Sequence, residues 1–436
     1  MLLKAFNCFI RPLDYLNVLN VAAREFTCPT RELRENYQVE QFNRVWTDAW
    51  ENVPFYAEWK NEHHLPDKIS SLDEVESWPI VARCDLQKNT VLLERLNNPP
   101  DGQHMTGGST GQPFRFGTWK EGLGHIIPNM WIGRRAYGIE PGDRTCLLWG
   151  HYNIYGEGFN RRVNVLKRKL NDWLLNSCRI SAYDLSPAAM QLAFQKVVKF
   201  SPKFLIAFSP AMLAFCRTNR ANKDACHRLQ VKCVLCSAGP LTRNEREEIS
   251  SYFNAPVCME YGSAECGVMA YTVPSGGYQT FWQTHLLQTV PDFQNVHRNI
   301  VTCLTMQYLP LIRYDIGDYL DVYPNEVKRP HRFISVLGRP SEVVKFSDGT
   351  AFFSLLIGEC VKQVLKVIAH QTILRGDAMY IHVLADGKLT TEEADWIIQR
   401  CRIVVPALTT KRISVEQKEK LKMSVGGKVP LVVYEQ

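Results

Sequence analysis

The chain has 436 residues, of which 45% are hydrophobic and 22% are charged, and its formal net charge is +7. These proportions are typical of a folded globular protein and exclude a disordered or fibrous chain. A charge of this size is mild for the length, so it suits a protein with anionic ligands but argues against one that coats nucleic acid. The length is sufficient for two or three domains.

The fourteen cysteines have no regular spacing, which indicates reduced thiols in a reducing compartment. The closest pair, Cys233 and Cys236, lies in the apolar run VKCVLCSAG, which predicts a buried strand. Residues three apart on a strand point to opposite faces, so this pair is poorly placed to chelate a metal. We interpret these cysteines as structural.

The first 26 residues are apolar but interrupted by charged and polar side chains, including Lys4, Arg11 and Asp14. They contain no long apolar core and no cleavage site of small residues, so we expect a helix packed on its own domain and no signal peptide. The sequence contains no uncharged apolar stretch of the length, about 18 residues, that a membrane span needs. We therefore expect no transmembrane segment and a cytoplasmic protein.

In chain order, residues up to about 100 are expected to be mostly helical. Beyond them, short apolar runs alternate with helical stretches: TCLLWG, KFLIAFS and VKCVLCSAG against SPAAMQLAFQKVVKF and TRNEREEISSYF. This alternation predicts an α/β layered domain with a parallel sheet, followed by a β-rich subdomain at about 280–335.

A domain boundary is expected between Arg339 and Glu342. The large N-terminal domain would then span 1–338, and a small, mobile α+β domain would span 339–436. In the latter, MYIHVLAD and TKRISVEQ predict strands, and TTEEADWIIQRCR predicts a helix.

The clearest local signal is the segment TGGSTGQP, from Thr106 to Pro113. Its glycines and hydroxyl groups can surround phosphate oxygens with backbone and side-chain donors. It is not a Walker A loop, because Gln112 stands where that motif has a lysine. Taken alone, such a segment is also compatible with an ordinary flexible loop.

Three further segments occur in order and strengthen the phosphate interpretation. SAGP, from Ser237 to Pro240, ends an apolar strand, where open α/β sheets bind ligands. MEYGSAECG, from Met259 to Gly267, places an acidic side chain in a turn flanked by glycines. PLIRYDIGD, from Pro310 to Asp318, precedes Gly338-Arg339.

The ordered set TGGSTGQP, SAGP, EYGSAECG, LIRYDIGD and GR resembles the adenylate-forming superfamily of acyl- and aryl-CoA ligases. Within it, the sequence is most similar to phenylacetate-CoA ligase-like proteins, including the CapK-type branch of capsule biosynthesis. The matching motifs extend from Thr106 to Lys428 and so cover most of the chain.

The resemblance implies a role for each matching position. Glu265 would bind Mg²⁺, and Lys428 would contact the carboxylate and the α-phosphate during adenylation. Asp318 would accept hydrogen bonds from the ribose hydroxyls, and Arg339 would hold ribose or phosphate near a hinge. In nucleotide binding, the resemblance implies Thr106, Gly107, Gly108, Ser109, Thr110 and Gly111 over the phosphates. Ala238, Gly239 and Pro240 would flank the adenine, with Tyr261 and Gly262 beneath it, and Glu260 and Ser263 are further nucleotide-binding candidates.

Aromatic residues near strand ends are candidates for an acyl pocket, although such residues are also common in cores. They are Trp149, His151, Tyr152, Tyr155 and Phe208. The polar positions are also compatible with purely structural roles. Glu265 and Asp318 would then be ordinary carboxylates in turns, and Lys428 would be a surface residue.

The sequence departs from the family pattern at a few positions. Ala264 stands where the family has Thr or Ser, Gln112 replaces a frequent lysine, and Ser341-Glu342 replaces an acidic hinge pair. Each change removes hydrogen bonding worth about 1–3 kcal/mol where a charged partner is left unpaired. A catalytically weak or non-catalytic nucleotide-binding relative is therefore one alternative.

The leading hypothesis is an enzyme that uses ATP and Mg²⁺ to activate a small carboxylic acid, for example an aromatic one, as acyl-AMP. The acyl group would then pass to CoA or to the thiol of an acyl-carrier protein. A second hypothesis is an adenylyltransferase or acyl-transfer enzyme of surface-polysaccharide biosynthesis that does not use CoA. No nucleic-acid partner is expected, and a homodimer is left open.

Overall fold

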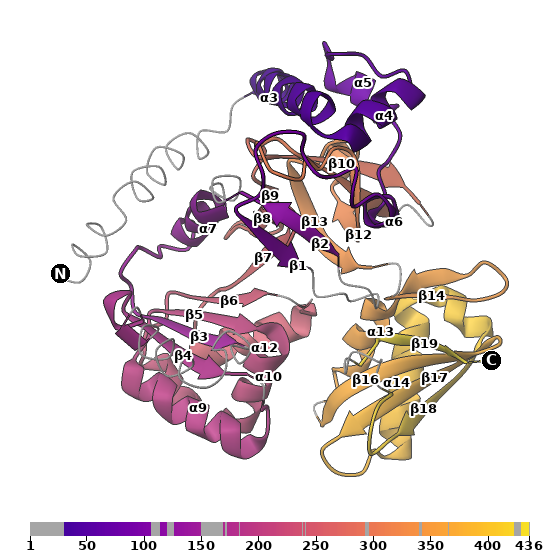
Figure 1. Ribbon diagram of the computed structural model, residues 1–436. Helices are drawn as coiled ribbons and strands as arrows, with labels where there is room; N and C mark the ends of the chain where they lie inside the picture. The colour runs from indigo at the N-terminus through magenta and orange to yellow at the C-terminus, as the bar shows by residue number, and fades with distance from the viewer. Residues whose placement is uncertain are drawn as a thin grey trace.

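The computed structural model describes residues 30–105, 114–119, 126–149, 169–170, 172–182, 184–237, 239, 241–292, 296–339, 342–364, 366–422 and 429–435. Within these ranges no helix is long and apolar enough to cross a bilayer. The fold is a mixed α/β arrangement of a large sheet, helices around it and a smaller C-terminal unit (Figure 1). The predicted α/β fold class is therefore confirmed.

The large sheet has eleven strands in the order β10-β11-β12-β13-β9-β8-β7-β6-β5-β3-β4. One half, from β4 to β7, is parallel, and the other half, from β7 to β10, is antiparallel. The parallel half contains β3 (Thr145–Trp149), β4 (Ser177–Ser181), β5 (Phe204–Phe208), β6 (Cys233–Ser237) and β7 (Val257–Ser263). The antiparallel half adds β8 (Gly267–Thr272), β9 (Tyr278–Thr280), β10 (His285–Pro291), β11 (His297–Cys303), β12 (Tyr314–Val322) and β13 (Arg332–Gly338).

The parallel strands are short apolar runs because both of their faces are covered. In β6, Val234 and Cys236 pack in the main core, whereas Cys233 and Leu235 pack in a second cluster on the other face. The two cysteines thus point to opposite faces, as the sequence predicts, and the described residues contain no cluster of metal-binding side chains. The connecting helices are α7 (Ile126–Arg135), α9 (Pro187–Phe200), α10 (Ser209–Thr218), α11 (Lys223–His227) and α12 (Arg243–Phe253).

The helical start of the chain packs over the antiparallel half (Figure 1). Its helices are α3 (Arg31–Asn52), α4 (Pro54–Glu62), α5 (Leu72–Glu76) and α6 (Arg83–Lys88). Helix α3 begins where the Thr30 side chain accepts a hydrogen bond from the N–H of Leu33. Its buried positions Phe42, Val45, Trp46 and Ala49 follow helical spacing and form one apolar face.

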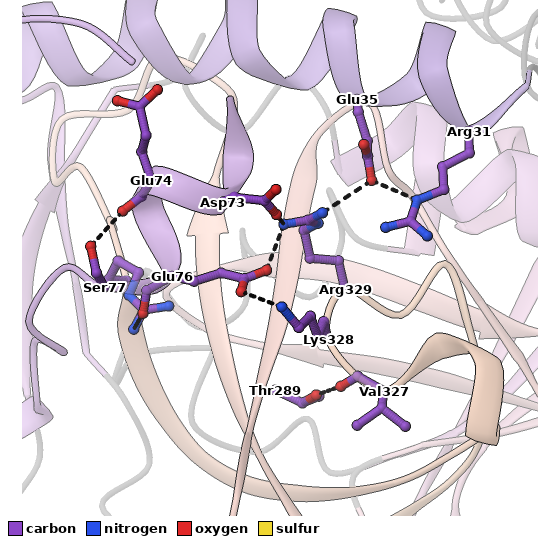
Figure 2. A network of polar contacts seen from close by, with 11 residues as sticks. Arg31, Glu35, Asp73, Glu74, Glu76, Ser77, Thr289, Val327, Lys328 and Arg329 are labelled. Atoms are coloured by element: carbon purple, nitrogen blue, oxygen red, sulfur yellow. Dashed lines mark hydrogen bonds and ion pairs between the residues drawn. The ribbon is translucent and has the colours of Figure 1, made fainter. Parts of the chain in front are cut away.

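An ion-pair network fixes these helices to the segment between β12 and β13 (Figure 2). The guanidinium of Arg329, which is 10% exposed, lies 3.3 Å from Glu35, 2.7 Å from Asp73 and 2.5 Å from Glu76. Lys328 adds a more exposed contact to Glu76 at 3.1 Å. Three carboxylates around one nearly buried arginine form a network, and such a network stabilises a fold more than isolated surface ion pairs do.

The C-terminal unit has a separate hydrophobic core and a separate sheet of order β18-β17-β16-β19. It begins with the hairpin β14 (Val343–Lys345) and β15 (Ala351–Phe353), which leads into α13 (Ser354–Val361). The strands are β16 (Val367–Arg375), β17 (Ala378–Ala385), β18 (Arg412–Gln417) and β19 (Val432–Glu435), with α14 (Thr391–Val404) between β17 and β18. The predicted strands at β17 and β18 and the predicted helix at α14 are confirmed.

Polar contacts join α12 of the large part to α13 of the C-terminal unit. The Lys362 ammonium lies 2.7 Å from Glu245, which is 2% exposed, and the N–H of Arg243 donates to Glu359 at 2.9 Å. Glu245 also accepts hydrogen bonds from Thr242 and so closes the capping box of α12. The contact therefore uses a carboxylate that α12 already holds in one orientation.

Candidate active site

The carboxyl ends of the parallel strands bring several predicted residues together. Trp149 ends β3 and Phe208 ends β5, and their rings lie edge to face with centroids 6.4 Å apart. Phe208 pairs with Ser237 at the end of β6, and Gly239 lies so near that an added Cβ would meet the Phe208 ring at 4.0 Å. This edge of an open α/β sheet is where such folds bind ligands.

Ser209, which follows Phe208, fixes the segment after β6. Its hydroxyl donates to the carbonyl oxygen of Gly239 at 2.8 Å and contacts that of Ser237 at 3.3 Å. The aromatic pair and the predicted adenine-binding segment therefore share one edge. Their predicted neighbours Ala238, Pro240, His151 and Tyr152 lie outside the described residues.

A polar cluster joins β7, β11 and β12 of the large sheet to the start of the C-terminal unit. The Tyr261 hydroxyl on β7 donates to Asp318 on β12 at 3.0 Å, and it accepts from the Asn299 amide on β11 at 2.9 Å. The other Asp318 oxygen lies 3.2 Å from Nε of Arg339, directly after β13. The structure thus brings Tyr261, Asp318 and Arg339 together, as the motif order predicts.

The charge state of this cluster depends on burial and on Arg339. Burial raises the pKa of Asp318 above its usual range, while the Arg339 guanidinium and the Tyr261 hydroxyl oppose that rise. Burial also raises the pKa of the Tyr261 hydroxyl well above its usual value, which keeps it a hydrogen-bond donor. An ionised Asp318 in this position has the lone pairs needed to accept hydroxyl groups of a ligand.

Arg339 leaves β13 through a tight turn. Gly338 has φ +116°, which a side chain would strain, and an added Cβ there would meet the Glu342 carboxylate at 2.2 Å. The N–H of Glu342 donates to the carbonyl of Arg339 at 2.8 Å. Burial raises the pKa of Glu342, and Arg339 opposes this rise. The predicted hinge position is therefore a specific turn with two carboxylates around one arginine.

Glu265 lies in the turn between β7 and β8 and is 6% exposed. Its Oε1 accepts a hydrogen bond from the Tyr314 hydroxyl at 3.1 Å, and the Arg83 guanidinium lies 4.0 Å away. The turn is held by Ser263, whose hydroxyl accepts from the N–H of Cys266 at 3.1 Å. Gly262 is required here, because an added Cβ would lie 2.3 Å from the carbonyl oxygen of Gly267.

A small cavity lies beside Glu265. The other residues that line it are Phe116, Gly117, Thr118, Trp119, Gln307, Tyr308 and Leu309. The first three belong to β2 (Arg115–Thr118), which pairs with β1 (Gly102–Met105). These strands flank the predicted phosphate segment, in which Thr106, Gly107, Gly108, Ser109, Thr110 and Gly111 lie outside the described residues.

The residues around Glu265 fit a magnesium ion that is bound together with phosphate. Mg²⁺ in nucleotide sites uses one or two carboxylates, with phosphate oxygens and waters as its other ligands. Glu265 supplies one such carboxylate at the edge of a cavity. The donor set is thus suited to an ion that arrives with a nucleotide.

Glu260 lies apart from this group. Glu260 precedes Tyr261 on β7 and therefore faces the other side of the sheet. There, burial raises the pKa of Glu260, and the charge of Arg134 on α7 opposes this rise. Its Oε2 is buried without a hydrogen-bond partner in the described part of the chain. The structure therefore does not bring Glu260 to Asp318, although the two were predicted to share the nucleotide site.

Asn299, Arg83 and Tyr314 contact the predicted site residues but were not predicted from the sequence. Asn299 on β11 and Arg83 at the start of α6 lie in segments without a motif, and only the long-range packing of the chain brings them to the site. Tyr314 belongs to the motif that ends at Asp318, but its contact with Glu265 joins two separate motifs. Lys428, predicted to be catalytic, lies outside the described residues.

Relatives of known name resemble the chain at low identity. It aligns with protein CapK of Staphylococcus aureus at 23% identity over 65% of this chain and 62% of CapK. It aligns with phenylacetate-coenzyme A ligase of Pseudomonas putida at 22% identity over 82% of this chain and 80% of the ligase. No model of a protein family matches the chain.

Solved structures of ligases share the fold. 2-Hydroxyisobutyryl-CoA ligase in its postadenylation state matches with a TM-score of 0.72 at 18% identity, over 94% of this chain and 91% of that ligase. The same ligase in its thioesterification state, with CoA, matches over the same shares with a TM-score of 0.55 at 17% identity. Anthranilate CoA ligase with anthranoyl-AMP matches with a TM-score of 0.54 at 13% identity, over 74% of this chain and 65% of that ligase.

The chain is therefore similar to ligases of the adenylate-forming type in sequence, at 22–23% identity, and it shares their fold. Within that class, the named relatives confirm the resemblance to phenylacetate-CoA ligase-like proteins and to the CapK-type branch.

Proposed function

We propose that the protein is an ATP-dependent acid:thiol ligase that activates a carboxylic acid as acyl-AMP and transfers the acyl group to CoA or a carrier thiol. The observation that carries this proposal is the cluster of buried Asp318 and Tyr261 with the half-buried Arg339, with Glu265 close enough to contribute to the raised pKa of Asp318. This arrangement offers an acceptor for hydroxyl groups, a cation and a metal-binding carboxylate within one site.

In this proposal, the nucleotide lies across the carboxyl ends of β5 and β6 and over the turn after β7. Asp318 accepts the ribose hydroxyls, and Arg339 faces the ribose or a phosphate. Gly239, with Ala238 and Pro240, borders the adenine. The segment 106–111 covers the phosphates with its N–H and hydroxyl groups.

The first step joins two anionic groups, so positioning and charge neutralisation limit its rate. The acid's carboxylate oxygen attacks the α-phosphorus, and the bond to pyrophosphate breaks. Lys428 contacts the carboxylate and the α-phosphate and offsets their charge. Glu265 would hold Mg²⁺, which when bound neutralises phosphate charge.

The second step transfers the acyl group from AMP to a thiolate, with AMP as the leaving group. It needs a different face of the C-terminal unit at the site, so this unit has to rotate about the turn at Gly338 and Arg339. The higher TM-score to the postadenylation state than to the thioesterification state of 2-hydroxyisobutyryl-CoA ligase supports assigning the present arrangement to the stage before transfer to the thiol.

The acid is proposed to lie near Trp149 and Phe208, with His151 and Tyr152 as further candidates. The edge-to-face aromatic pair supports a planar, modest-sized acid, since an aromatic ring packs well against such side chains. Phenylacetate, the acid in the name of one relative, is therefore the first acid to test.

The similarity to CapK favours a second candidate function. In it, the enzyme also forms an acyl-AMP but hands the acyl group to an amine or a sugar hydroxyl in surface-polysaccharide synthesis. The two candidates share the first step and differ only in the acceptor.

Pyrophosphate release with ATP, Mg²⁺ and a panel of acids, measured with and without CoA, tests both candidates. Acid-dependent release that CoA accelerates, together with a thioester product, supports the ligase. Turnover that does not depend on CoA rejects it in favour of the second candidate. ATP binding without acid-dependent exchange of pyrophosphate into ATP across the panel contradicts both.

A further inference from the structure

Gln371 is a fully buried polar residue in the core of the C-terminal unit. It lies on β16, is 0% exposed, and has the apolar residues Ile373 and Leu374 close behind it on the same strand. A buried amide has to find hydrogen-bond partners, because an unsatisfied one costs about 1–3 kcal/mol. The partners that Gln371 finds are backbone groups from another part of the chain.

The three hydrogen bonds of this side chain go to two backbone positions. Its Nε2 donates to the carbonyl oxygens of Lys422 at 3.0 Å and Pro430 at 2.8 Å. Its Oε1 accepts from the N–H of Lys422 at 3.0 Å. One amide group therefore ties together two points that are eight positions apart in the sequence.

The segment between these two points carries Lys428. Residues 423–428 lie outside the described residues, but the backbone on both sides is fixed. After the segment, the chain returns to the sheet, where the N–H of Thr372 donates to the carbonyl of Leu431 at 2.8 Å. Before it, the Lys422 side chain forms an ion pair with Glu435 at the end of β19.

We propose that Gln371 is a positioning residue for Lys428, because it fixes both ends of the segment that carries this lysine to β16. The inference rests on the proposed function, in which Lys428 contacts the carboxylate and the α-phosphate. The sequence of the segment includes Gly426 and Gly427, and glycine restricts the backbone less than any other residue type. Fixing its two ends restricts the positions that the lysine can reach, and a misplacement of about 1 Å costs about 100-fold in rate.

The test is Gln371→Met in the full chain, a change that keeps the length of the side chain but removes all three hydrogen bonds. With the acid that the wild-type protein uses best, acid-dependent exchange of pyrophosphate into ATP is expected to fall about 100-fold. The loss is expected in kcat, with the KM for ATP unchanged, because Asp318 and Arg339 still hold the nucleotide.

A comparison with Lys428→Ala separates positioning from general stability. If Gln371 acts through the lysine, the double variant Gln371→Met/Lys428→Ala is no slower than Lys428→Ala alone. Hydrogen exchange adds a readout that needs no acid: the amides of 421–431 are expected to exchange faster in Gln371→Met, and those of β17 are not.

Gln417 offers a matched control in the same unit. It lies on β18 and makes the same kind of bonds at another loop, since its Nε2 donates to the carbonyl of Gly387 and its Oε1 accepts from the N–H of Leu389, both at 2.8 Å. Gln417→Met is expected to leave pyrophosphate exchange unchanged.

Should Gln371→Met fail to fold, Gln371→Asn retains the amide but is one methylene too short to reach both backbone positions. A loss of exchange with normal thermal stability in either folded variant supports the proposal. Unchanged exchange, or a loss that adds fully to that of Lys428→Ala, overturns it. If the wild-type protein exchanges no pyrophosphate, the proposed function itself has failed, whereas wild-type exchange with an unaffected Gln371 variant rejects only this inference.

Discussion

The polar cluster around Asp318 and the contact between α12 and α13 are both built from charged side chains, but their surroundings differ. Asp318 and Tyr261 are buried within one sheet, and each has fixed hydrogen-bond partners on neighbouring strands. Glu245 and Lys362 join two bodies that have separate hydrophobic cores. The first group can be disturbed only by disturbing the sheet, whereas the second can separate while both cores stay intact.

This difference suits the two tasks that the proposed reaction imposes. A nucleotide site benefits from groups that are already in place before the ligand binds, because no reorganisation is then needed during the reaction. A unit that has to rotate between two steps benefits from contacts whose loss exposes little apolar surface. Substitutions in the two regions should therefore have different consequences for activity.

The largest effect is expected from Asp318→Ala. It removes a charged acceptor worth about 1.5–3 kcal/mol, so kcat/KM for ATP should fall about 10- to 100-fold. Steady-state pyrophosphate release over a range of ATP concentrations measures this. Asp321→Ala, three residues further along β12, is the matched control and should leave kcat/KM for ATP unchanged. Equal effects of both variants would contradict the role of Asp318.

Arg329→Met tests a charged network that lies wholly within the large part (Figure 2). It leaves Glu35, Asp73 and Glu76 without their shared arginine, so the free energy of unfolding should fall by about 1–3 kcal/mol. Chemical denaturation measures this. The activity of the folded protein should not change, because the network lies in one body and does not respond to rotation. Lys328→Met, at the more exposed neighbour, should cost much less.

Lys362→Met tests the contact between the two bodies. It leaves Glu245 with its bonds to Thr242 but without a partner on α13, so the arrangement for the first step should lose about 1 kcal/mol, or about fivefold in population. The ratio of pyrophosphate exchange to complete turnover should fall accordingly. Glu247→Gln, in an exposed pair with Arg243 on the same helix, should leave this ratio unchanged. A ratio that is equal in both variants would contradict the interpretation of this contact.

The smallest effect is expected from pH. The raised pKa of Asp318 means that acidification protonates it sooner than an ordinary aspartate, and the protonated group is a poorer acceptor for ribose hydroxyls. The KM for ATP should therefore rise as pH falls, with a midpoint above the ordinary aspartate value of about 3.9. Arg339 opposes this shift, whereas Glu265 and Glu342 surround the same region with further negative charge. Asp318→Asn should flatten the profile; an unchanged profile would contradict the assignment.

Much of the fold could be predicted from the sequence because local patterns determine it. The apolar run around Cys233 predicts a strand covered on both faces, and the spacing in α14 predicts a helix with one buried side. The order of the strands could not be predicted, since β13 pairs with β9 across a long separation in sequence. A short sequence pattern predicts a single strand but does not predict which distant strand it pairs with.

The candidate site could be predicted only as far as its motifs extend. Tyr261, Asp318 and Arg339 were expected to meet because they stand at matching positions of one family pattern. Asn299 has no motif, and its contact with Tyr261 joins β11 to β7, two strands that are not neighbours in the sheet. Glu260 belongs to the same motif as Tyr261, but adjacent residues on a strand face opposite sides, so the motif does not bring it to Asp318.

A crystal structure of the full chain with ATP and Mg²⁺ tests the central claim most directly. The account predicts a ribose whose hydroxyl groups bond to Asp318, a phosphate chain that runs towards Glu265, and a metal ion at that carboxylate. A nucleotide bound elsewhere, or none at saturating ATP with Asp318 still bonded only to Tyr261 and Arg339, would contradict it.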